Sequence, residues 1–129
     1  MIVIADTTVL FHLNYHNTKM EAIFNELRIT QILITRINYL ELLSGASENE
    51  KKRTRKFLQP YPVLEFDAKT TIVANNLAMK YRVSNRQSKD FLIASIAFAN
   101  KIPLLTENSK DFTAYKGLKL LPYKISMWL

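Results

Sequence analysis

Several acidic side chains of this sequence stand in apolar surroundings rather than among other polar residues. They either follow a short apolar run directly or interrupt an apolar stretch of helical spacing. A carboxylate in such a position is costly to bury unless a partner balances its charge. The candidates for chemistry are these acids and one neighbouring amide: Asp6, Glu41, Asp90, Glu107, Asn108 and Asp111.

Taken singly, most of these acids also have a structural interpretation. Asp6 could cap a helix that begins at the next residue, and Asp90 could offset the dipole in the first turn of a helix. Asp111 could cap a turn. Taken singly, Asp90 and Asp111 fit the structural interpretation better. Asp6 fits a structural role and a role in chemistry equally well. Glu41 is harder to explain, because its neighbours are leucines.

Taken together, the acids favour a metal site. Carboxylates gathered at one place repel one another and usually need a cation, and oxygen ligands suit Mg²⁺ or Mn²⁺. The chain has no cysteine and only two histidines, His12 and His16, which argues against zinc. Its net charge of +7 is typical of proteins with polyanionic partners. An acidic metal site in a basic protein favours a phosphodiester substrate that is attacked by metal-activated water.

Short strands that alternate with helices must position these acids. The pattern predicts an α/β fold with a central, mostly parallel sheet and helices on both faces. Ligands of such sheets gather beyond the carboxyl ends of the strands, where Asp6 would lie. We predict strands at 1–5, 31–35, 63–66, 102–106 and 118–121, a helix over 36–44, and helices after capping residues Thr18, Ser47, Asp67 and Ser88.

The 129 residues predict one domain, 1–129, without linkers or repeats. The absence of cysteine fits a reducing compartment. The opening apolar run is too short for a signal peptide, and no run reaches membrane-spanning length. We therefore expect a cytoplasmic protein without a membrane partner.

The order of these segments resembles the PIN-domain ribonucleases, most closely the VapC-type toxins of type II toxin–antitoxin systems. Asp6–Leu10 is similar to the family's D-[ST]-x-hydrophobic-hydrophobic start, and Glu41 to its helix-borne glutamate. Asp90–Ala97 is similar to its D-x-hydrophobic-hydrophobic-A-x-x-A signature. Leu104–Phe112 is similar to its L-x-T-x-[DN]-x-x-[DEH]-F block. The resemblance covers essentially the whole chain and implies a PIN-like three-layer sandwich.

The resemblance also implies roles for individual residues. Asp6, Glu41 and Asp90 would be catalytic acids that hold Mg²⁺, for which Mn²⁺ can substitute. Many family members carry Asp at the position of Asn108. The carbonyl of Asn108 can still ligate the ion, directly or through water, and Asp111 could supply the missing charge as a fourth acid, so the choice between Asn108 and Asp111 for completing the metal site stays open. Hydroxyl groups would support the site: Thr106, and one of Thr7 and Thr8, with the choice between them open.

Basic residues precede Asp90 in the sequence. If Asp90 lies at the site, these side chains are well placed to meet RNA phosphates, although Arg86 and Lys89 could instead pair with acids of a neighbouring subunit. They are Arg82, Arg86 and Lys89.

The leading hypothesis is an Mg²⁺-dependent endoribonuclease that acts as a toxin on RNA, for which the resemblance implies a cognate antitoxin and a homodimer. The alternative is a catalytically weakened PIN-like domain that only binds RNA or a partner, and Asn108 keeps it open. A phosphatase with Asp6 as nucleophile is weaker, because such enzymes carry a second acid two residues later, where this chain has Thr8.

Overall fold

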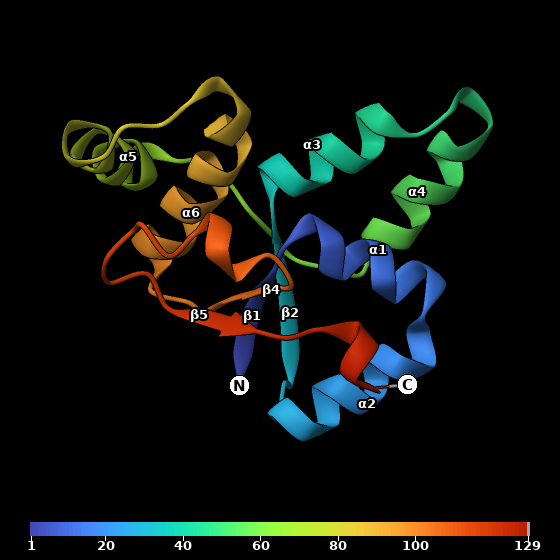
Figure 1. Ribbon diagram of the computed structural model, residues 1–129. Helices are drawn as coiled ribbons and strands as arrows, with labels where there is room; N and C mark the ends of the chain where they lie inside the picture. The colour runs from blue at the N-terminus through green and yellow to red at the C-terminus, as the bar shows by residue number, and fades with distance from the viewer. Residues whose placement is uncertain (129) are drawn as a thin grey trace.

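The computed structural model describes residues 1–128, with side chains described for residues 1–126. A five-stranded sheet with strand order β3-β2-β1-β4-β5 forms its centre, and each pair of neighbours is parallel (Figure 1). The strands are β1 (Ile2–Ala5), β2 (Gln31–Thr35), β3 (Val63–Leu64), β4 (Leu104–Thr106) and β5 (Leu120–Pro122). The helices are α1 (Thr7–Tyr15), α2 (Asn17–Leu27), α3 (Arg36–Gly45), α4 (Lys51–Leu58), α5 (Ala68–Lys80) and α6 (Ser88–Asn100).

The central strand β1 is buried on both faces. Val3, Ile4 and Ala5 are fully inaccessible to solvent. β1 pairs with β2, where Ile4 aligns with Leu33, and with β4, where Ile4 aligns with Leu104. A nearly continuous apolar run is what a parallel strand covered on both sides requires.

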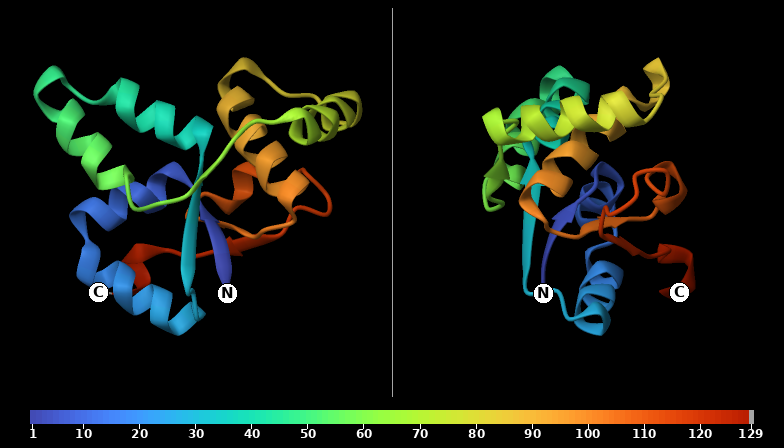
Figure 2. Two further views of the ribbon diagram at one scale, coloured as in Figure 1. Left: turned by 180° about the vertical axis from the view of Figure 1, so that it is seen from behind. Right: turned by 90° about the vertical axis from the view of Figure 1, so that its left-hand side faces the viewer.

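Two hydrophobic clusters separate the layers of the fold. On one face, Val3 and Ala5 pack in a cluster with residues of α1, α2 and α4, such as Val9, Met20 and Leu58. On the other face, Ile4 packs in a cluster with residues of α6 and of the loop after β4. α5 packs on the outer side of α6. α3 begins at the end of β2 and extends away from the pair α5–α6 (Figures 1 and 2). The predicted three-layer α/β architecture is thus confirmed.

One of the predicted helix caps, Asp67, is present in the structure, whereas Thr18 and Ser88 do not cap helices. Asp67 caps α5 as predicted, since its Oδ1 accepts a hydrogen bond of 2.9 Å from the Thr70 amide. The prediction for Thr18 is wrong, because α2 follows α1 almost directly and begins at Asn17. Ser88 is not a cap either, because a 3₁₀ turn (Asn85–Gln87) runs straight into α6.

Within residues 1–128, no helix has the length and apolar character needed to cross a membrane.

Substitution of Ile4 by Ala is expected to destabilise the protein by about 3 kcal/mol, because it opens a cavity between the two layers. The matched control is Ile72→Ala on α5, where the side chain is 65% exposed and the change should stay within about 0.5 kcal/mol. Urea unfolding followed by circular dichroism measures both values. Equal effects of the two substitutions would contradict this account of the core.

Candidate active site

The carboxyl edge of the sheet brings together residues that are far apart in the sequence. Asp6 directly follows β1, Thr35 ends β2 and Thr106 ends β4. From β1 the chain proceeds to β2 on one side and later returns to β4 on the other. A parallel sheet has its crevice for ligands at such a switch point.

Asp6 is the most enclosed of the candidate acids, with 5% of its surface exposed. Its Oδ1 accepts a hydrogen bond of 2.8 Å from the Thr7 amide, so it begins α1, and its Oδ2 accepts one of 2.8 Å from the Thr106 hydroxyl. Burial raises the pKa of Asp6, while the two hydrogen bonds oppose the rise. Asp6 therefore both caps a helix and presents a carboxylate to the edge.

Thr7, rather than Thr8, connects Asp6 to Glu41. The Thr7 hydroxyl donates to Oε1 of Glu41 at 2.5 Å and accepts a hydrogen bond of 2.8 Å from the Asn38 side-chain amide. Asn38 is fully buried, and its Oδ1 accepts a bond of 2.6 Å from the Thr35 hydroxyl. The sequence predictions assigned no role to Asn38. Its spacing from Thr35 is that of a capping box, which is the signal that could have found it.

Glu41 also bridges two helices. Its Oε2 forms an ion pair with Nζ of Lys89 on α6. Lys89 therefore contacts an acid of its own chain, whereas the sequence suggested phosphates or a neighbouring subunit. Arg82 and Arg86 lie exposed near the amino end of α6 and form no ion pair with the described residues.

Asp90 lies in the first turn of α6, half-buried, next to the other acids. Burial raises its pKa from 3.8 to about 6, and the negative charges of Asp6, Asp111 and Glu41 add to the rise. Asp111, in the 3₁₀ turn after β4, also acts on the pKa of Asp6. The four predicted acids thus share one electrostatic environment.

Two other candidates of the same segment lie differently. Asn108 is exposed, and its side-chain amide donates a long hydrogen bond of 3.4 Å to the Thr8 hydroxyl. Glu107 joins a separate cluster: its Oε2 lies 3.5 Å from Nε2 of His12, and its Oε1 accepts from the Ile125 amide. The edge acids therefore do not include Glu107.

The donor set fits a divalent cation that prefers oxygen, because the edge offers carboxylates that repel one another and no sulfur. Among the described residues, however, no three His, Asp or Glu side chains already converge on one point. At least one acid must therefore turn for the group to hold an ion. Glu41 already forms an ion pair with the ammonium group of Lys89.

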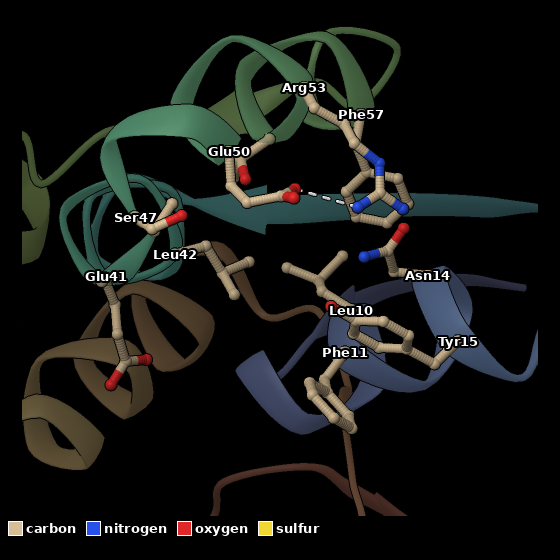
Figure 3. Close-up of a pocket in the computed structure, with 13 residues that line it drawn as sticks. Leu10, Phe11, Asn14, Tyr15, Glu41, Leu42, Ser47, Glu50, Arg53 and Phe57 are labelled. Carbon is tan, nitrogen blue, oxygen red and sulfur yellow. Dashed lines mark hydrogen bonds and ion pairs between the residues drawn. The ribbon is translucent and has the colours of Figure 1, made fainter.

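A second feature is a groove between α1 and the pair α3–α4. It encloses about 360 Å³, and its lining includes the apolar side chains of Leu10, Leu42 and Phe57. Phe11 and Tyr15 stand on its α1 side, 52% and 59% exposed, with ring centroids 4.7 Å apart. Glu41 borders the groove but points away from its centre, towards α6 (Figure 3).

Comparison with known proteins identifies the family of the chain. The model of the PIN domain family matches residues 3–118. The chain belongs to the PIN-domain family. Ribonuclease VapC2 of Rickettsia felis is 28% identical over 108 residues, which are 82% of this chain and 81% of that protein. The resemblance to VapC-type PIN domains that the sequence indicated is confirmed.

Solved PIN-domain structures share the fold. VapBC2 from Rickettsia felis, crystallised with a DNA fragment from its promoter, has a TM-score of 0.76 at 25% identity and covers 96% of this chain and 100% of that one. A toxin–antitoxin complex from Klebsiella pneumoniae has a TM-score of 0.73 at 24% identity, covering 95% of this chain and 98% of that one. The second likeness concerns the fold alone.

Asp90→Asn is expected to stabilise the metal-free protein at pH 7. The carboxyl has a pKa of about 6 in the folded chain and an ordinary value of 3.8, so between these pH values only the folded state keeps the proton. Wild-type stability must then fall as the pH rises through this window. Because Asp90 is half exposed, the gain at pH 7 should be about 1 kcal/mol.

Thermal unfolding in EDTA between pH 4 and pH 7 measures this effect. Glu21→Gln removes an equal charge from an exposed position on α2, away from these acids, and serves as the control. An Asp90→Asn protein that is no more stable than wild type at pH 7 would contradict the raised pKa.

Proposed function

We propose that this PIN-domain protein is an Mg²⁺-dependent endoribonuclease that acts as the toxin of a toxin–antitoxin pair. The observation that carries the proposal is the placement of Asp6, Glu41, Asp90 and Asp111 near one another beyond the carboxyl ends of the strands, where the charges of the other three act on Asp90. The ribonuclease name of the Rickettsia relative supports the reaction, and the VapBC complex supports the pairing.

In this proposal, Asp6, Glu41 and Asp90 hold the cation, and Asp111 completes the negative charge around it. The side-chain carbonyl of Asn108, at the start of the 3₁₀ turn that carries Asp111, offers a further oxygen ligand. A bound Mg²⁺ supplies charge stabilisation at the phosphate and a lowered pKa for water. The Thr106 hydroxyl keeps Asp6 in its orientation, and Thr7 keeps Glu41 in its own. The hydrogen bond from Thr106 limits the rotation of the Asp6 carboxylate, which favours a fixed position of the scissile phosphate.

Substrate binding is assigned to the amino end of α6. Arg82 and Arg86 are exposed there and free to contact the phosphate backbone, and Arg86 lines a hollow with Asp90 and Asp111. The net charge of +7 supports a polyanionic substrate.

Asp6→Asn should lower the rate of RNA cleavage roughly 100-fold or more while the fold is retained. The side-chain oxygen of the asparagine still accepts from the Thr7 amide, and its NH2 group can donate to the hydroxyl oxygen of Thr106, so the fold should persist. Cleavage of a labelled RNA in Mg²⁺ and in EDTA, together with growth arrest on expression, measures the effect. Asp67→Asn, which changes the capping aspartate of α5, is the matched control.

Unchanged cleavage or toxicity in Asp6→Asn would sink the proposal. RNA that is bound without Mg²⁺ and left intact when Mg²⁺ is added would support the alternative, a weakened RNA-binding domain. Cytoplasmic action and a homodimer, both predicted from the sequence, stay predictions.

For the antitoxin, we propose that one of its segments occupies the groove between α1 and α3–α4. Such a segment would carry apolar side chains, because Leu10, Leu42 and Phe57 line the groove and Phe11 and Tyr15 stand exposed on its α1 side. Exposed aromatic groups beside a hollow are typical anchors of protein interfaces. A segment bound there would lie against α3 next to Glu41 and would restrict access to the acids.

Phe11→Ala should weaken the complex with the antitoxin about tenfold or more, since the ring offers a large apolar contact at the edge of the groove. Titration calorimetry with the cognate antitoxin measures the affinity. Met79→Ala on α5, whose side chain is 83% exposed, controls for the loss of an exposed apolar group elsewhere. Equal affinities of the two variants would place the antitoxin on another surface.

A further inference from the structure

Among the described residues, Lys89 and Glu41 form the one ion pair of the candidate site. The ion pair connects the second residue of α6 to the middle of α3. Asp6, Asp90 and Asp111 have no such partner among the described residues. Lys89 therefore occupies the position of a counter-ion for the acids.

The two oxygens of Glu41 are held in different ways. Oε1 accepts from the Thr7 hydroxyl, which is itself fixed by the buried Asn38. Among the described residues, the one polar partner of Oε2 is Lys89, whose side chain is 63% exposed. Thr7 is thus a fixed support, whereas an exposed lysine ammonium is held weakly and exchanges readily with water or other ions.

Lys89 also has room to leave. Together with Glu41, it lines a hollow of about 560 Å³ that includes apolar residues of α3 such as Ile37 and Leu40. The long alkyl chain of a lysine can lie along such a surface while its ammonium reaches solvent. The ammonium can therefore turn away from Glu41 without any movement of the backbone.

We propose that Lys89 is a positioning residue that holds Glu41 until a divalent cation binds, and that its ammonium then turns to a phosphate of the RNA. This proposal rests on the proposed metal-dependent function. No three acids converge as they stand, and Glu41 is turned towards Lys89. A divalent ion on Oε2 of Glu41 competes with the ammonium for the same oxygen and repels it.

The movement of Lys89 from Glu41 to a phosphate couples the binding of the divalent cation to the binding of RNA. A bound cation frees Lys89 for the RNA, and a phosphate that draws Lys89 away leaves Glu41 free for the cation. Each ligand thereby favours the other, as thermodynamic linkage requires.

The first test measures metal binding to the full-length chain without RNA. Lys89→Gln should bind Mn²⁺ about fivefold more tightly than wild type in titrations followed by electron paramagnetic resonance. Lys110→Gln is the matched control, because Lys110 also directly precedes a site acid, Asp111, and forms no ion pair with the described residues. Its Mn²⁺ affinity should stay within about twofold of wild type.

The second test measures RNA binding in EDTA, where no cleavage is expected. In the wild-type background, Lys89→Gln should change the affinity for a labelled RNA less than about twofold, because the ion pair with Glu41 keeps Lys89 away from the RNA. In a Glu41→Gln background the lysine is released, and the same substitution should weaken RNA binding about fivefold. Fluorescence anisotropy of the four proteins completes this double-mutant cycle.

Three outcomes overturn the proposal. If Lys89→Gln weakens Mn²⁺ binding, or matches Lys110→Gln, Lys89 does not compete with the metal. If Lys89→Gln weakens RNA binding equally in both backgrounds, Lys89 is a permanent phosphate contact. If wild type binds no Mn²⁺, the proposed metal-dependent function fails and this proposal fails with it, whereas the first two results leave that function standing.

Discussion

The parallel pairing of β1 with β2 and β4 is the constraint on which the site depends. The alignment of Ile4 with Leu33 and Leu104 brings the ends of three strands to the same edge. Asp6 can then receive the hydroxyl of Thr106, although 100 residues separate them. A slip of one residue would exchange the two faces of β1 and bury the wrong side chains, so the apolar core enforces the register that gathers the polar groups.

Gathering acids at this edge has an electrostatic cost, and the surrounding structure limits it. Burial and neighbouring charges raise the pKa of Asp90 to about 6. Asp6 is supported by two hydrogen bonds, while Glu41 is supported by Thr7 and by the charge of Lys89. Such a site stores unfavourable interactions that a cation can relieve, which is a common reason for perturbed acids at functional positions.

Helix α3 connects the two surfaces to which we assign functions. One side of α3 lines the groove with Leu42, and the other side carries Ile37 on the hollow shared with Lys89. Glu41 stands between them and borders both. A partner that shifts α3 from the groove would therefore act on the orientation of Glu41 without touching the acids, in addition to any direct obstruction.

The sequence by itself determined the sheet, the order of its layers and the positions of the acids. Short apolar runs such as residues 1–5, between segments of helical spacing, favour buried parallel strands, and a parallel sheet brings the residues that follow them to one edge. Sequence reasoning could not decide between Thr7 and Thr8, and it missed Asn38. Only the tertiary structure decided these points, because each depends on the direction in which a side chain points towards a distant segment. Thr7 meets Glu41 across 34 residues and Lys89 meets it across 48, and such partners are set by helix packing, which local sequence patterns do not encode.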